Sequence, residues 1–171
     1  MTSVITALST KDWPQIRAIY EDGIRGRLAT FETEVPNWEE WNKKYLKICR
    51  LGIRKGATLL GWATLSPVSM RKVYRGVAEV SIYIAANAQG KKLGSCLMQR
   101  LINESEKAGI WMLQSSVFPH NPASMRLHEK TGFRKVGYRE RIAQLDGVWL
   151  DTILFERRVI HSETISSDKG F

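Results

Sequence analysis

The sequence predicts an α/β protein built on one mixed β-sheet of about seven strands with four helices. Stretches with apolar residues at alternate positions indicate strands, and stretches with apolar residues three and four apart indicate helices. The two kinds are interleaved in the order strand, helix, helix, three strands, helix, strand, helix and two strands. This order favours a mixed sheet over a doubly wound parallel one.

The first 65 residues are expected to supply three strands and two helices. A short strand is predicted over Val4–Leu8, and the apolar spacing within residues 13–20 marks a helix. A second helix is expected to begin at Asn37, and its buried face is predicted to consist of Trp38, Trp41, Tyr45 and Ile48. Strands near residues 51–55 and 58–65 follow.

The clearest strand is Val77–Ile84, in which apolar and other residues alternate. The apolar face consists of Val80, Ile82 and Ile84, and the opposite face of Glu79, Ser81 and Tyr83. A helix that ends at Gly109 follows. A strand over 111–118, a short helix over 121–131 and strands near 135–143 and 148–157 complete the expected domain, residues 1–158. Residues 159–171 are expected to form a polar, serine-rich tail.

The charge, the apolar content and the cysteines of the chain argue against several classes of protein. The net charge of +9 favours an anionic partner, but the basic residues are scattered and form no stripe, so we expect no nucleic-acid partner. No apolar run approaches the ~20 residues of a membrane span, and the N-terminus lacks the pattern of a signal peptide. Cys49 and Cys96 have neither CxxC spacing nor nearby histidines. We therefore expect a cytoplasmic protein without a metal site, with both cysteines buried as small apolar residues.

Two segments have the residue types of a binding site. Between Ile84 and Gly94 a strand, a glycine-containing loop and a helix start follow one another, an arrangement whose backbone N–H groups can hold a pyrophosphate. Taken alone, such a glycine is more often a simple turn. In the segment Asn121–Phe133, Ser124 and His128 lie four apart on one helical face. Taken alone, this histidine is more often a surface or core residue.

Together, in this order, the two segments resemble the GNAT superfamily of N-acetyltransferases, and more closely its phosphinothricin N-acetyltransferase branch. The resemblance covers roughly residues 4–158 and is carried by Arg27–Thr33, Gly76–Ile84, the loop Gln89-x-x-Lys92-x-Gly94, Asn121–Phe133 and Gly147–Asp151. It implies a centrally splayed sheet, acetyl-CoA as co-substrate and a homodimer. The residues that it implies for cofactor binding are Ile82, Tyr83, Ile84, Gln89, Gly90, Lys91, Lys92, Leu93, Gly94, Asn121 and Ser124.

One loop position departs from the family pattern, because Lys92 stands where a glycine is usual. Only a positive φ would strictly require glycine there. The amide of Lys92 can still face a phosphate if the backbone angles of this residue are helical.

The acceptor amine must lose a proton before it can attack a thioester. Glu79 is the candidate base, because an unpaired carboxylate would be costly in an apolar strand. A structural salt bridge with Arg75 is the alternative. His128 is the candidate proton donor or thiolate stabiliser, since relatives often place a tyrosine at the matching helix position. A backbone N–H near Tyr83 or Ile84 could stabilise the oxyanion.

The acceptor implied by the resemblance is a small amino-acid-like amine such as phosphinothricin, methionine sulfoximine or methionine sulfone. The guanidinium groups of Arg71 and Arg75 match its acidic group, with an exposed loop arginine as the alternative for Arg71. Candidate pocket walls are Phe31, Tyr74 and Trp149. Cys96 has no basic partner in the sequence, so we expect direct attack without an acyl-enzyme. A protein N-terminus or lysine as acceptor, and a non-enzymatic acyl-CoA sensor, stay open.

Overall fold

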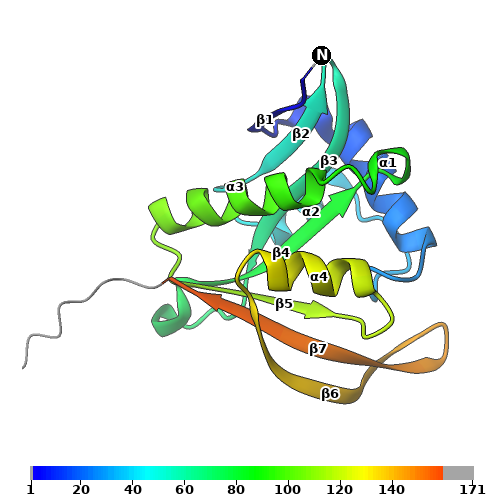
Figure 1. Ribbon diagram of the computed structural model, residues 1–171, viewed down its shortest axis with the longest axis vertical. Helices are drawn as coiled ribbons and strands as arrows, with labels where there is room; N and C mark the ends of the chain where they lie inside the picture. Colours follow the sequence, from blue (N-terminus) through cyan, green and yellow to red (C-terminus); the bar gives the residue numbers. More distant parts are fainter. Residues whose placement is uncertain (1, 160–171) are drawn as a thin grey trace, which may run out of the picture.

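The protein folds around one seven-stranded mixed sheet, and the computed structural model describes residues 2–159 (Figure 1). The strand order is β1-β2-β3-β4-β5-β7-β6. The strands are β1 (Val4–Ala7), β2 (Leu51–Lys55), β3 (Thr58–Pro67), β4 (Val77–Ile84), β5 (Met112–Val117), β6 (Arg134–Leu145) and β7 (Val148–Arg158). Within residues 2–159, only β4 and β5 pair in parallel. The predicted mixed α/β fold is confirmed.

Four α-helices cover the two faces of this sheet. They are α1 (Trp13–Arg25), α2 (Trp38–Lys44), α3 (Leu93–Lys107) and α4 (Pro122–Lys130), with short 3-10 turns η1 (Thr10–Asp12), η2 (Lys72–Tyr74) and η3 (Ala86–Ala88). Figure 1 shows α3 and α4 in front of the sheet and α1 and α2 behind it. None of the helices within residues 2–159 combines the length and apolar character needed to cross a membrane.

Local sequence signals explain where the helices begin and end. Asn37 and Glu40 cap the start of α2 reciprocally, each side chain accepting a hydrogen bond from the other's backbone N–H at 3.0 Å. Beyond α3 and α4 the chain turns at Gly109 and Gly132, whose φ angles of +83° and +87° favour glycine.

The two faces of the sheet hold separate apolar cores. The α3 and α4 side contains Leu97, Met98, Leu101 and Ile102 of α3, together with Val80 of β4 and Phe155 of β7. The opposite side is aromatic: Trp41 of α2 packs against Trp62 of β3, and Tyr83 of β4 stacks on Trp62 with ring centroids 4.7 Å apart. The predicted alternation of β4 is therefore confirmed, because neighbouring residues of this strand join opposite cores.

Three details differ from the sequence-based expectations. Ile48 is 42% exposed, because α2 ends at Lys44 and Tyr45 already has an extended backbone. Cys96 is exposed, since Leu97 and Met98 take the buried side of α3 at that turn. Cys49 is half-buried, and burial raises the pKa of its thiol to about 11. The predicted polar tail lies outside the described residues except for Val159.

Candidate functional site

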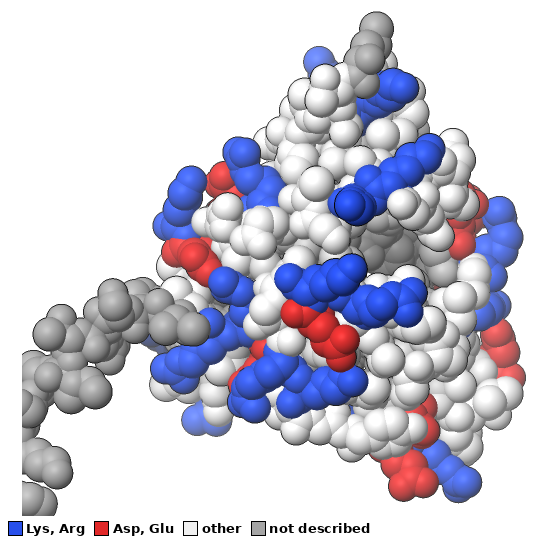
Figure 2. All heavy atoms as spheres, in the orientation of Figure 1, with Lys and Arg blue, Asp and Glu red and all other residues white. Residues whose placement is uncertain are grey.

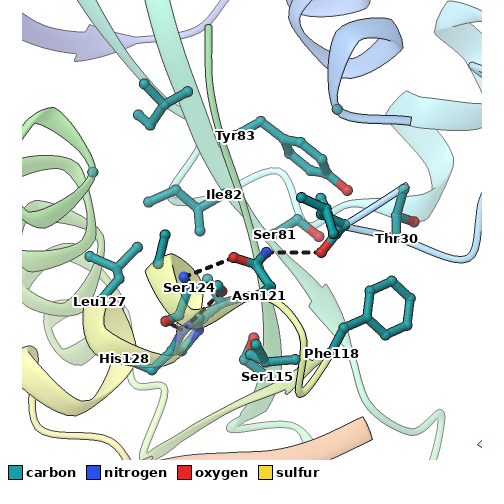
Figure 3. Close-up of a pocket in the computed structure, with 18 of the residues that line it drawn as sticks. Thr30, Ser81, Ile82, Tyr83, Ser115, Phe118, Asn121, Ser124, Leu127 and His128 are labelled. Carbon is teal, nitrogen blue, oxygen red and sulfur yellow. Dashed lines mark hydrogen bonds between the residues drawn. The ribbon is translucent and has the colours of Figure 1, made fainter. Parts of the chain in front are cut away.

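A cavity of about 980 Å³ lies where β4 and β5 separate. The two strands pair only over Val77–Glu79 and Met112–Gln114, and the cavity lining takes in their unpaired continuations, residues 80–84 and 115–117. Side chains from α1 and α2 line one side, and side chains from α3 and α4 line the other. The cavity therefore passes through the gap in the sheet (Figure 3).

At the end of β4 the loop to α3 has the geometry of an anion site. Gly90 and Lys92 both have positive φ angles, +75° and +61°, and α3 starts at Leu93. The first N–H groups of a helix have no partner within the helix, and loops of this kind direct further N–H groups at a bound anion. The lining includes Gln89, Gly90, Lys92, Leu93 and Gly94, so these backbone groups border the cavity.

Lys92 does not have the right-handed helical backbone angles under which glycine would be unnecessary at this position. Its φ of +61° and ψ of +8° lie in the left-handed region, where a side chain is strained and glycine is favoured. The tight turn that ends at the start of α3 imposes this conformation. The glycine usual at this position in the family pattern would carry no such strain.

Basic side chains border the α3 and α4 side of the cavity. Lys92, Arg126 and Lys130 are part of its lining. Lys91 is not, because its ammonium donates to the carbonyl oxygen of Asn87 at 2.9 Å and its side chain borders a separate hollow of about 340 Å³. Figure 2 shows basic side chains around the hollow in this face, with acidic side chains among them rather than a continuous basic band. This end of the cavity suits a phosphorylated ligand.

Asn121 joins the α3 and α4 side to the loop that follows α1. Its side-chain oxygen accepts from the N–H of Ser124 at 3.0 Å and caps α4, while its amide nitrogen donates to the carbonyl oxygen of Leu28 at 2.8 Å (Figure 3). Both Asn121 and Ser124 line the cavity. The segment 26–37, here called the acceptor loop, is thereby held over the cavity.

His128 lies in the cavity wall but is almost fully buried. Its Nδ1 lies 2.8 Å from the carbonyl oxygen of Ser124, which can only accept, so Nδ1 carries the proton of the neutral ring. Burial lowers the pKa of His128, and its ring packs against the rings of Phe133 and Phe155. A neutral imidazole with its N–H held by a carbonyl has no proton to donate from Nε2. The structure therefore argues against the predicted role of His128 as proton donor.

Glu79 lies half-buried in the cavity wall, on the face of the sheet toward the acceptor loop. Its Oε2 accepts a hydrogen bond of 3.1 Å from Nε2 of Gln114 on β5, and its strand neighbour on β3 is Ser66. Among the described residues no ion pair joins Glu79 to Arg75, so the alternative structural role is not supported. Glu79 is positioned to take a proton from a ligand in the cavity.

The acceptor loop supplies further wall residues on the same side. Phe31 lines the cavity, as predicted for an acceptor pocket, and packs edge-on against Phe118 with centroids 4.8 Å apart. Glu32 also lines the cavity and forms an ion pair of 2.8 Å with the ammonium of Lys44 on α2. In Figure 3, Thr30 lies across the cavity from Asn121 and Ser124.

The other acceptor candidates lie elsewhere. The residues that do not line this cavity are Arg71, Tyr74, Arg75 and Trp149. The guanidinium of Arg71 lies 5.6 Å from the ring centroid of Tyr74, and that of Arg75 lies 5.4 Å from the ring of Trp111. The N–H groups of Trp111 and Met112 both donate to the carbonyl oxygen of Gly76, and this pairing holds the indole against Arg75. Within a single copy of the chain, these arginines therefore do not lie where they were expected to bind the acidic group of an acceptor in this cavity.

Several wall residues were missed from the sequence. Glu32 and Lys44 face each other only because the acceptor loop folds over the sheet, and no local pattern signals this contact. Hydroxyl groups also line the cavity, from Thr30, Ser66, Ser81, Ser116 and Thr152. Of these, Ser81 shares the alternation of Glu79 and could have been found from the strand pattern.

Comparisons with known proteins agree with this geometry. A profile of the acetyltransferase (GNAT) family matches residues 13–133. The chain is 31% identical over 160 residues to a phosphinothricin N-acetyltransferase of Alcaligenes faecalis, covering 90% of this chain and 81% of that protein. It is 28% identical over 157 residues to an L-methionine sulfoximine/L-methionine sulfone acetyltransferase of Pseudomonas aeruginosa, covering 88% of this chain and 91% of that protein.

Among solved structures, the chain is similar to a ribosomal-protein-alanine N-acetyltransferase from Brucella melitensis. The TM-score is 0.83 and the identity is 26%, over 91% of this chain and 99% of that one. Relatives of this fold therefore include proteins named for free amino-acid analogues and one named for a protein acceptor.

Proposed function

Because this chain belongs to the GNAT family of acetyltransferases and is an acetyl-CoA-dependent N-acetyltransferase, we propose that it acetylates the free amine of a small amino-acid-like acceptor. The observation that carries the proposal is the position of Glu79, a carboxylate in the wall of a cavity with a basic end and a polar end. The acceptors named for the relatives, phosphinothricin, methionine sulfoximine and methionine sulfone, are the first candidates.

The residues at the basic end fit acetyl-CoA. We assign the pyrophosphate to the backbone of Gln89–Gly94, because the positive φ angles there expose N–H groups at the start of α3. Val80–Ile84 of β4 have no partner on β5, so part of the backbone of Ile82, Tyr83 and Ile84 is available to an extended ligand. Asn121 and Ser124 border the same space. Acetyl-CoA supplies the activated acetyl thioester, and no metal ion is required.

The acetyl group passes directly to the amine in the proposed mechanism. Glu79 accepts a proton from the acceptor ammonium, and the freed amine attacks the thioester carbonyl. As the carbon–sulfur bond breaks, the nitrogen gives its second proton to the departing sulfur, so that the amide and the free thiol of coenzyme A are formed. A backbone N–H of β4 near Tyr83 or Ile84 donates to the developing oxyanion. Cys96 does not line the cavity, which supports direct attack rather than an acyl-enzyme. Within this mechanism His128 packs the wall and transfers no proton.

A homodimer in the cytoplasm is part of the same proposal. The β6–β7 hairpin exposes large apolar side chains on its surface, namely Val136, Tyr138, Ile142, Val148 and Trp149. Such a patch supports association with another protein surface. A second copy of the chain is the partner that the family resemblance implies.

A protein N-terminus is the second candidate acceptor. The observation in its favour is the structural likeness to the ribosomal-protein-alanine N-acetyltransferase. The discriminating experiment measures thiol release from acetyl-CoA with free amino acids, their sulfone and sulfoximine analogues, and short peptides. Turnover of peptides above that of free amino acids would favour the protein acceptor.

Glu79→Gln tests the mechanism. General-base catalysis contributes about 10²- to 10⁴-fold in rate, so kcat should fall by about that factor while the KM for acetyl-CoA changes little. Glu21→Gln is the matched control, because Glu21 is exposed on α1 and does not line the cavity. The melting temperature is measured on the same preparations. A Glu79→Gln enzyme that retains most of its kcat would exclude Glu79 as the base.

A further inference from the structure

Charged side chains are distributed unevenly between the two sides of the cavity. Four basic side chains belong to the described lining, and Lys92, Arg126 and Lys130 are those on the α3 and α4 side. Lys44 is the fourth and lies on the opposite side, where Asp22, Glu32 and Glu79 are the acidic wall residues. These acidic residues would repel an acceptor that carries a carboxylate, unless a cationic side chain bound that carboxylate.

The fold holds Lys44 in the cavity wall. Lys44 is the last residue of α2, and three residues earlier Trp41 is fully buried against Trp62. Residues three apart lie on neighbouring positions of one helix face, so the buried indole fixes the side from which Lys44 extends. The Lys44 ammonium donates to Oε1 of Glu32 at 2.8 Å and lies 5.6 Å from the ring centroid of Tyr45.

Lys44 also retains capacity to bind a ligand. An ammonium group has three N–H donors, and the described contacts use one of them, to Glu32. Its side chain is 43% exposed, so the remaining donors can be reached from the cavity. Partial burial opposes its charge, but Tyr45, Glu32 and Glu79 outweigh this effect and raise the pKa of Lys44, which stays charged at neutral pH. The pair with Glu32 is too exposed to matter much for stability.

We propose that Lys44 binds the α-carboxylate of the acceptor and so selects free α-amino acids over peptide N-termini. This inference rests on the proposed function, because it assigns the acceptor ammonium to Glu79. In an α-amino acid the two charged groups are attached to one carbon, and the cavity offers an acid and a cation on the same side. A peptide N-terminus has an amide in place of that carboxylate and gains nothing from the cation. Lys44 thus takes the role that was expected of Arg71 and Arg75.

The test compares two acceptors that differ only in this group, methionine sulfone and methionine sulfone carboxamide. Thiol release is measured for the wild type, Lys44→Met, Lys44→Arg and the control Lys43→Met, whose residue is exposed beside Lys44 and does not line the cavity. Loss of one charge-assisted hydrogen bond should lower kcat/KM for methionine sulfone about 10- to 100-fold in Lys44→Met. The carboxamide should change less than about twofold, and Lys44→Arg should recover part of the loss.

The ratio of the two acceptors in one preparation does not depend on the folded fraction, so partial misfolding of Lys44→Met cannot imitate the result. Equal losses for both acceptors, or no loss for either, would refute the role of Lys44 while leaving the proposed function intact. A wild type that acetylates the carboxamide but not the free acid, or neither compound, would instead refute the proposed acceptor class and the role of Lys44 with it.

Discussion

Replacing Lys92 with glycine should stabilise the protein, although it removes a charged side chain from the cavity wall. Lys92 has a φ of +61° at the start of α3, in the left-handed region. A residue with a Cβ atom pays about 1–2 kcal/mol for this conformation. Glycine avoids that strain but loses about 0.5–1 kcal/mol through the greater freedom of the unfolded chain. With the middle of each range, the net gain in the free energy of unfolding is about 0.75 kcal/mol.

Thermal unfolding measures this gain. In a chain of this size 1 kcal/mol corresponds to about 2–4 °C, so the melting temperature of Lys92→Gly should rise by about 1–4 °C. Lys92→Ala is the matched control, because it removes the ammonium but keeps the Cβ atom and its strain. The two variants should lose acetyl-CoA affinity equally and modestly, by up to about fivefold for one exposed charge.

The comparison of the two variants decides the question. A Lys92→Gly protein no more stable than Lys92→Ala would refute the inference that the backbone of Lys92 is strained. If Lys92→Gly alone bound acetyl-CoA more tightly than the wild type, the lysine would obstruct the loop through its backbone rather than assist it through its charge.

Two further predictions concern residues whose expected catalytic or binding role the structure does not support. Burial lowers the pKa of His128 below its value of about 6.5 in the unfolded chain. As the pH falls below that value, His128 takes up a proton in the unfolded state but not in the folded state. The free energy of unfolding should therefore decrease from pH 7 to pH 5. His128→Asn should show a smaller decrease in melting temperature over this range, and an unchanged decrease would contradict the assignment. Arg75→Ala should lose up to about 1 kcal/mol of stability through its contact with Trp111 and leave the acceptor KM within about twofold. A large rise in that KM would show that Arg75 contacts the acceptor.

Local patterns were sufficient to predict most of the fold. The alternation in Val77–Ile84 identified both faces of β4, and Gly109 and Gly132 marked the ends of α3 and α4, because these signals depend on residues close in sequence. The exposure of Ile48 was missed for a related reason. The apolar spacing continued past Lys44, but the backbone left the helix there.

The candidate site was predictable only in part. The loop and the Asn121–Phe133 segment lie beside the cavity because each follows a strand of the separated pair. The placement of Arg75 was missed, since it depends on Trp111, which lies far along the chain and reaches Gly76 only in the folded sheet. Lys44 was missed for the same physical reason, because its contact with Glu32 requires the acceptor loop to close over β3 and β4.

The short pairing of β4 with β5 has a consequence for how ligands enter and leave the cavity. Because these strands part after Glu79, the cavity is bordered by exposed residues on both sides of the sheet, including Lys130 on one and Glu32 on the other. In the proposed arrangement the nucleotide portion of acetyl-CoA occupies the helix α3 side, and the amine arrives beneath the acceptor loop. In that arrangement the two ligands would enter from opposite faces of the sheet, so the amine and its acetylated product would use a route separate from that of coenzyme A.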